Sequence, residues 1–256
     1  MRGYDHRSYG DGFADVYDDW YADVTDVAAT IDRMVRLAGP DGAVLELGVG
    51  TGRLAIPMAE AGLQVVGIDS STAMLSRLGL RDPRGTVEAI CGDMVVDLPA
   101  RRFDAVLIAY NTIFNLLGDG EQQVLFERIA ERLAPAGSFI VEAFVPGDDI
   151  ATLGASTAAP EVTVRSMTAD HVVLSVSVNR PADQCAEGQF IQLSETGGVQ
   201  LRPWSIRWST PSQLDAMAAH AGLRLHSRFA DMAGTEYTDE SATHVSVYRS
   251  ADVQNE

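Results

Sequence analysis

The chain contains no lysine, so all 19 of its basic residues are arginine. This absence excludes Schiff-base catalysis by a lysine, a lysine-bearing phosphate loop and lysine-assisted hydride transfer. Basic residues are also few beside the 36 acidic ones, and the net charge is −17. An acidic surface repels nucleic acid phosphates and anionic lipid headgroups. We therefore expect neither nucleic acid nor a membrane as a partner.

Cysteine is scarce as well. Cys91 and Cys185 are too few for a disulfide framework, and neither lies in a CxxC pair. No apolar run has the length of a membrane span, and the first twelve residues lack the apolar stretch of a secretory signal. We expect a cytoplasmic protein in a reducing environment, with Cys91 buried as a small apolar residue. No group of cysteines, histidines and carboxylates has metal-binding spacing, so the expected reaction needs no metal.

Apolar residues make up 46% of the chain, enough for one α/β domain of 256 residues. Short apolar runs alternate with helical patterns through the first 145 residues. Strands are expected at 43–47, 65–69, 86–90, 105–109 and 139–143, and helices at about 53–61, 72–78 and 122–133. Such alternation predicts βαβ units, hence a mainly parallel sheet with helices on both faces.

Both flanks of this region have their own patterns. A helix is expected over 9–37, with Phe13, Tyr17, Trp20 and Tyr21 on one face. Apolar and polar residues alternate at 161–167, 172–179, 190–194 and 199–208, as in antiparallel strands. A helix at 214–221 and strands at 223–229 and 244–248 follow. We predict one domain over 1–256: a helical lid (1–37), a Rossmann-like core (38–146 and 209–250), and an antiparallel β insertion after strand five (147–208).

The strongest motif is Glu46-Leu47-Gly48-Val49-Gly50-Thr51-Gly52, at an expected strand-to-helix turn. Glycines permit a tight turn and let the backbone approach a ligand closely. Asp69 ends the next strand, where a carboxylate can accept hydrogen bonds from ribose hydroxyls. The context favours a nucleoside site over a plain glycine-rich turn.

Together with Cys91-Gly92-Asp93-Met94, these residues resemble the motifs of class I S-adenosylmethionine-dependent methyltransferases. The resemblance covers residues 40–145, and the ends more loosely. It implies S-adenosylmethionine as cofactor, with the methionine part over the glycine loop and the ribose on the acid matching Asp69. It implies adenine contacts from Asp93 and Met94. The cofactor residues implied are Glu46, Gly48, Gly50, Gly52, Asp69, Ser70, Asp93, Met94, Tyr110 and Asn111.

A dinucleotide-dependent oxidoreductase is the natural competitor, because it also uses a glycine loop and a ribose-binding acid. The third glycine comes one residue early for GxGxxG, and the Gly92-Asp93-Met94 turn has no role there. The missing lysine also weighs against hydride transfer.

Methyl transfer requires placement of the acceptor beside the cofactor more than covalent help from the protein. The aromatic N-terminal segment and the loop 110–115 can both reach that place. Tyr9, Tyr17 and Phe114 are the candidates for positioning the acceptor, whereas Phe13 and Trp20 fit helix packing better. His6 is the histidine nearest the expected lid and the one worth testing as a base.

The lid, the Asn111–Leu117 loop and the late antiparallel insertion resemble bacterial natural-product N-methyltransferases acting on amino sugars or lincosamides. The amino-sugar type places a histidine in that loop and this chain has none, which favours the lincosamide type. The resemblance implies a small-molecule amine as substrate in antibiotic biosynthesis, and a homo-oligomer built through the insertion. A small-molecule O-methyltransferase and a non-catalytic cofactor-binding regulator remain alternatives.

Overall fold

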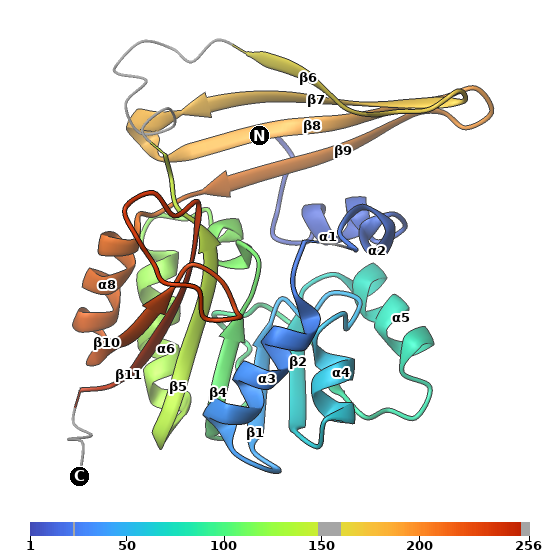
Figure 1. Cartoon of the computed structure of the whole chain (residues 1–256). Helices are drawn as coiled ribbons and strands as arrows, with labels where there is room; N and C mark the ends of the chain where they lie inside the picture. The colour runs from blue at the N-terminus through green and yellow to red at the C-terminus, as the bar shows by residue number, and fades with distance from the viewer. Residues whose placement is uncertain (23, 148–159, 252–256) are drawn as a thin grey trace.

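The computed structural model describes residues 1–22, 24–147 and 160–251, which form two sheets with helices around the larger one (Figure 1). The helices are α1 (Ser8–Phe13), α2 (Tyr17–Trp20), α3 (Val27–Ala38), α4 (Ala55–Glu60), α5 (Thr72–Arg81), α6 (Glu121–Arg132) and α8 (Pro211–His220), with 3-10 turns η1 (Thr112–Asn115) and η2 (Pro181–Asp183). None of the helices described is long and apolar enough to cross a bilayer.

The larger sheet has seven strands in the order β10-β11-β5-β4-β1-β2-β3. Its strands are β1 (Ala43–Leu47), β2 (Gln64–Asp69), β3 (Glu88–Cys91), β4 (Phe103–Ile108), β5 (Leu133–Phe144), β10 (Leu223–Phe229) and β11 (Thr243–Ser250). The strands from β1 to β5 pair in parallel, whereas β11 is antiparallel to both β5 and β10. The chain moves outward from β1 to β3 and returns to β4 on the other side of β1. This reversal leaves a crevice beyond the carboxyl ends of the central strands.

Two apolar cores cover the two faces of this sheet. Side chains of α6 and α8, such as Phe126 and Leu214, pack on one face. Met34 of α3, Met58 of α4 and Leu78 of α5 pack on the other. The α/β sheet with helices on both faces is confirmed. Ser71 caps α5, since its Oγ accepts a hydrogen bond from the Met74 amide.

The smaller sheet has the order β6-β7-β8-β9 and is antiparallel throughout, which confirms the predicted insertion. Its strands are β6 (Glu161–Met167), β7 (His171–Arg180), β8 (Cys185–Ser194) and β9 (Gly198–Arg207). It lies as a roof over the carboxyl edge of the larger sheet, with α1 and α2 between the roof and α5 (Figure 1).

The single helix expected over 9–37 is wrong, because the segment forms three helices. The Asp26 side chain accepts a hydrogen bond from the Ala29 amide and caps a new helix, α3, which packs on the larger sheet. The aromatic residues instead belong to α1 and α2 and form a separate cluster with Phe190 of the roof. Cys91 also differs from expectation, since it is exposed at the end of the edge strand β3.

His244 is fully buried on β11. Its Nδ1 lies 2.9 Å from the Ser246 hydroxyl, which also accepts a hydrogen bond from Nε of Arg228. Burial, and to a lesser degree the charge of Arg228, lowers the pKa of His244 to about 4. The folded chain therefore holds this histidine neutral.

We expect stability to fall as the pH falls from 6.5 toward 4. In this range the unfolded histidine takes up a proton that the folded one does not. At pH 5 the loss attributable to His244 is about 2 kcal/mol. Urea unfolding of the wild type and His244→Asn between pH 7 and pH 5 measures it, with His220→Asn as an exposed control. An equally steep pH dependence in His244→Asn would contradict the assignment.

Candidate active site

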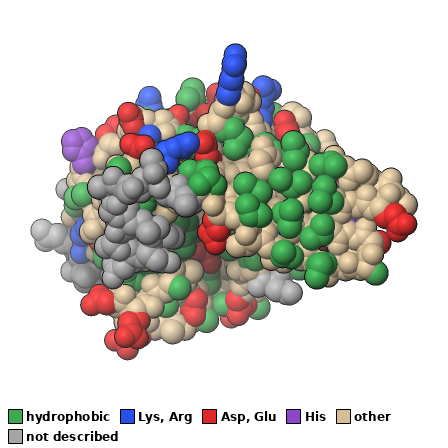
Figure 2. All heavy atoms as spheres, turned by 90° about the horizontal axis from the view of Figure 1, so that it is seen from above, with side chains coloured by type: hydrophobic (Ala, Val, Ile, Leu, Met, Phe, Trp, Pro, Cys, Tyr) green, Lys and Arg blue, Asp and Glu red, His purple; other side chains and the backbone are tan. Residues whose placement is uncertain are grey.

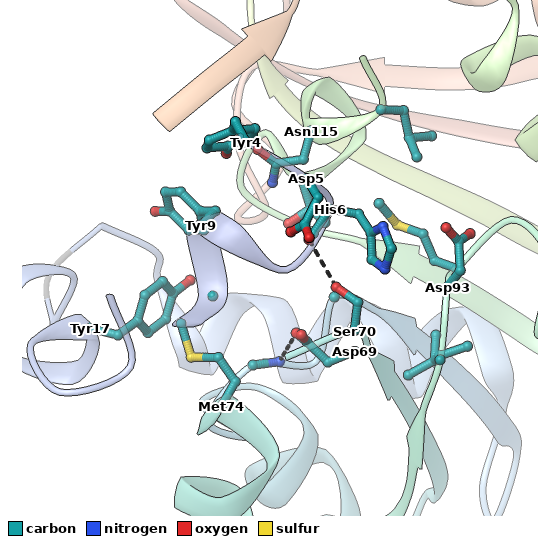
Figure 3. A pocket seen from close by; sticks show the side chains of 18 residues that line it. Tyr4, Asp5, His6, Tyr9, Tyr17, Asp69, Ser70, Met74, Asp93 and Asn115 are labelled. Atoms are coloured by element: carbon teal, nitrogen blue, oxygen red, sulfur yellow. Dashed lines mark hydrogen bonds between the residues drawn. The ribbon is translucent and has the colours of Figure 1, made fainter. Parts of the chain in front are cut away.

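A pocket of about 780 Å3, counting the part open to solvent, lies over the carboxyl ends of the central strands (Figure 3). The loops after β1, β2 and β3 form one wall, and the N-terminal segment with η1 forms the other. The lining residues are Tyr4, Asp5, His6, Tyr9, Gly10, Tyr17, Gly48, Gly50, Ile68, Asp69, Ser70, Met74, Gly92, Asp93, Met94, Thr112, Asn115 and Leu116. This is the crevice that the strand order creates.

The glycine loop after β1 needs its glycines. Gly48, Gly50 and Gly52 have φ of 70°, 55° and 78°, a left-handed backbone that other residues rarely adopt. A Cβ on Gly48 would also lie 2.5 Å from Cγ2 of Thr112 in η1. The loop therefore turns sharply, and at Gly48 and Gly50 its backbone lines the pocket with no side chain in between.

Asp69 ends β2 and is held by backbone amides on both of its oxygens. The Gly50 amide donates to Oδ2 at 2.9 Å, and the Ser71 amide donates to Oδ1 at 2.8 Å. Burial raises the pKa of Asp69, and these hydrogen bonds partly offset the rise. Each oxygen keeps a second lone pair, so the carboxylate can still accept a pair of hydroxyl donors such as a ribose diol.

Ser70, Asp93 and Met94 continue the same wall of the pocket. The Asp93 Oδ1 accepts hydrogen bonds from the amides of Val95 and Val96, which shapes the loop after β3. His6, on the opposite wall, lies near Asp93, and its carbonyl accepts a hydrogen bond from the Ser70 hydroxyl (Figure 3). The predicted ribose and adenine residues are thus brought together.

A second cluster of charge lies at the end of β1. Glu46 is buried, and burial raises its pKa to about 8 despite the nearby Arg53. Oε2 of Glu46 and both Nε and one terminal nitrogen of Arg53 are buried without a hydrogen-bond partner within the described structure. A buried acceptor and a buried cationic donor fit the ammonium and the carboxylate of an amino acid. Neither residue lines the pocket in this structure, but their unpaired buried groups fit the methionine end of S-adenosylmethionine.

Arg53 was missed by the sequence analysis. It comes directly after Gly52, and its proximity to the glycine loop was the available signal. Its interactions with Glu46, Glu142 and Tyr17 join three segments far apart in the chain. That convergence exists only after folding.

Of the three residues predicted to position the acceptor, two line the pocket and one does not. Tyr9 and Tyr17 face the pocket from α1 and α2 (Figure 3). Phe114, by contrast, is fully buried in the core, packs edge-on against Phe144 and does not line the pocket. Thr112 and Asn115, from the same turn, line the pocket in its place.

Tyr110 and Asn111 lie outside the pocket lining and shape the chain after β4. Both have positive φ, and the Asn111 Oδ1 accepts a hydrogen bond from the Phe144 amide at 2.7 Å. The Tyr110 amide donates to a carboxylate oxygen of Glu142 at 3.0 Å. These contacts position η1, and through it Thr112 and Asn115, over the glycine loop.

Comparisons with known proteins agree with this geometry. A family model described as a methyltransferase domain matches residues 44–137. The CcbJ methyltransferase from Streptomyces caelestis is 37% identical, with a TM-score of 0.87 over 97% of this chain and 100% of that one. The cypemycin N-terminal methyltransferase from a Streptomyces species is 29% identical over 77% of this chain and 79% of its own.

A further solved structure shares the fold. It is the S-adenosylmethionine-bound amino pentose methyltransferase CalS10 from Micromonospora echinaspora, at 18% identity and a TM-score of 0.65. It covers 90% of this chain and 92% of that one.

Replacing Asp69 by Ala should weaken binding of S-adenosylhomocysteine by roughly 1.5–3 kcal/mol, the range for hydrogen bonds to a charged acceptor. Titration calorimetry measures the affinity. Glu88→Gln, at an exposed carboxylate of β3 paired with Arg101, is the matched control. Unchanged affinity in folded Asp69→Ala would remove Asp69 from the cofactor site.

Proposed function

Because the chain belongs to the class I S-adenosylmethionine-dependent methyltransferases, we propose that it methylates the nitrogen of a small-molecule amine in antibiotic biosynthesis. One relative that it matches over most of its length is a methyltransferase of a peptide N-terminus, according to its name. A peptide N-terminus is an amine, so this relative supports nitrogen over oxygen as the acceptor atom.

The observation that carries the proposal is the chemistry of the pocket wall. Asp69 and Asp93 are assigned to the ribose and the adenine, which leaves Asp5 and the tyrosines Tyr4, Tyr9 and Tyr17 for the acceptor, and no arginine is among the lining residues of the described chain. Carboxylates and aromatic faces attract cations. The sulfonium of the cofactor is a cation, and so is an amine before it loses its proton. A phosphorylated or carboxylated acceptor would meet repulsion here.

The cofactor supplies an activated methyl group, so the chain's task is to hold both molecules in line and to exclude water. The N-terminal segment lies over the pocket and provides the cover (Figure 3). Tyr9 and Tyr17 line the pocket. Burial raises the pKa of Tyr17 to about 12 and that of Tyr9 well above its usual value, so both hydroxyls stay protonated.

The direct test is an assay of the purified protein with S-adenosylmethionine and matched panels of secondary amines, amino sugars, N-terminal peptides, phenols and alcohols. We expect a mass gain of one methyl group on amines only, with a rate that rises with pH as the amine loses its proton. Methylation of hydroxyl acceptors alone would favour the O-methyltransferase alternative. Cofactor binding without any turnover would favour the non-catalytic regulator.

With an amine substrate in hand, Tyr9→Phe tests the role of the hydroxyl. The Tyr9 side chain is largely buried, is hydrogen-bonded to Tyr21 and lines the pocket. We expect kcat to fall roughly tenfold, the effect of losing one neutral hydrogen bond to a well-positioned group. The affinity for S-adenosylhomocysteine should change less than about threefold. A loss of cofactor affinity with unchanged kcat would assign Tyr9 to the cofactor instead.

We also propose that the outer face of the roof sheet is buried against a second copy of the chain. The strand register aligns mostly apolar side chains in adjacent rows across the four strands, with Gln189 the one polar member. The rows are Met167-Val172-Leu193-Val199, Val164-Leu174-Ile191-Leu201 and Val162-Val176-Gln189-Pro203. Figure 2, which views the molecule from above, shows hydrophobic side chains gathered on one face.

This face is exposed in the single chain: Val164 is 59% exposed and Leu201 60%. Contiguous apolar surface of this kind marks an interaction site. The rows contain no charged residue, so a complementary partner presents an apolar sheet face as well. The same face on a second copy of this chain is such a surface. Two such faces can pack against each other as the layers of a sandwich do.

Wild-type protein should therefore elute as a dimer or larger oligomer in size-exclusion chromatography with light scattering. The double variant Val164→Glu with Leu201→Glu should shift it to monomer, because four buried charges per dimer cannot be paired. Val96→Glu, on a loop of the larger sheet at 78% exposure, is the matched control. A wild-type monomer at micromolar concentration would refute the interface.

A further inference from the structure

Residues 4–20, the part of the predicted N-terminal lid that lies beside the pocket and is called the lid below, carry three aspartates that make contacts outside the segment. Asp11 lies on α1, Asp18 on α2 and Asp15 in the turn between the two helices. Each of the three contacts a different part of the protein. None of them lines the pocket, so their role is distinct from binding a ligand directly.

Asp11 holds the lid to the N-terminus of α5. Its Oδ1 accepts a hydrogen bond from the Ser71 hydroxyl at 2.6 Å. The two elements touch closely here, because a Cβ on the neighbouring Gly10 would lie only 2.4 Å from Cβ of Ser71. Gly10 therefore permits the contact that Asp11 makes.

Asp18 holds the lid to the glycine loop. Its Oδ1 accepts a hydrogen bond from the Thr51 hydroxyl at 2.6 Å and another from Arg81 at 2.9 Å. Arg81 also donates to the Thr51 hydroxyl at 3.1 Å, which closes a three-membered network. Thr51 is fully buried, whereas the side chains of Asp18 and Arg81 are each 41% exposed, so the Asp18–Thr51 hydrogen bond is the part of the network most shielded from water.

Asp15 holds the lid to the roof. Its two carboxylate oxygens accept hydrogen bonds from both terminal nitrogens of Arg202, at 2.5 and 2.8 Å. Arg202 is buried on β9 and also donates to the Gly12 carbonyl. A bidentate pair of this kind fixes both position and orientation.

The two core partners are adjacent to the groups that hold Asp69. Ser71, bound by Asp11, gives its own amide to Asp69, and Thr51, bound by Asp18, follows Gly50, which gives the other amide. We propose that Asp11 and Asp18 are positioning residues that latch the lid to the two cofactor loops, so that closing the lid holds Asp69 in its binding geometry and retains the cofactor.

If Asp11 and Asp18 latch the lid, the rate at which the cofactor is released depends on their hydrogen bonds. The pocket is lined by lid residues on one side and by the cofactor loops on the other, so a lid held in place narrows the path by which the cofactor leaves. Opening breaks the bonds of Asp11 and Asp18, and these bonds add to the barrier for release. This inference rests on the cofactor and not on the identity of the acceptor, so it survives failure of the amine proposal.

The test measures dissociation of radiolabelled S-adenosylhomocysteine from the full chain. Asp18→Ala should release it roughly tenfold faster, as expected for losing a hydrogen bond to a charged group. Asp11→Ala should show a smaller increase, because Asp11 is exposed to water. Asp19→Ala, at an exposed position on α2, is the matched control and should behave as wild type.

A double-mutant cycle with Thr51→Val separates the latch from a general loss of folding. If the Asp18–Thr51 bond acts as proposed, the pair should release cofactor no faster than the more affected single variant. A merely structural role would lower the melting temperature of the ligand-free variants and leave the release rate unchanged.

Trypsin provides an independent readout, since it can cut only at arginine in this chain and Arg7 is exposed in the lid. We expect cofactor to slow cleavage at Arg7 in the wild type and to protect Asp18→Ala less. Release rates in both latch variants equal to that of Asp19→Ala, together with unchanged protection at Arg7, would overturn the proposal.

Discussion

The arrangement of the site depends on one carboxylate held by two amides. Asp69 ends β2 and accepts the amides of Gly50 and Ser71, so it ties the loop after β1 to the start of α5. The left-handed glycines let the first loop reach it, and the Ser71 cap fixes the second. Because a buried carboxylate is costly without such donors, this one contact constrains both loops at once.

Segments far apart in the sequence cover the site that these two loops form. The lid crosses from the N-terminus to seat on Ser71 and Thr51, while Arg202 of the roof holds it from above. The roof thus has a role on each face. Its inner face anchors the lid through Arg202 and Phe190, and its outer face presents rows of apolar side chains. These two additions cover the methyltransferase core with acidic and aromatic side chains.

The errors of the sequence analysis share a physical cause. Helical periodicity over 9–37 could not distinguish a single long helix from three short ones, because the break depends on the Asp26 cap and on contacts with the roof. Phe114 carries the same aromatic signal as Tyr9, yet η1 turns it into the core and turns Thr112 and Asn115 toward the pocket. Tyr110 and Asn111 follow β4 as expected, but their left-handed backbone serves the turn.

Local patterns in the sequence determined the order of strands and helices, the parallel core, the antiparallel insertion, the glycine loop and the two acids Asp69 and Asp93. Each of these depends on residues close together in the chain, where periodicity and turn chemistry act. The tertiary structure alone decided that Arg53 lies near Glu142, that His6 faces Asp93, and that three aspartates of the lid bond to Ser71, Thr51 and Arg202. These residues are far apart in sequence, and only packing of the whole chain brings them together.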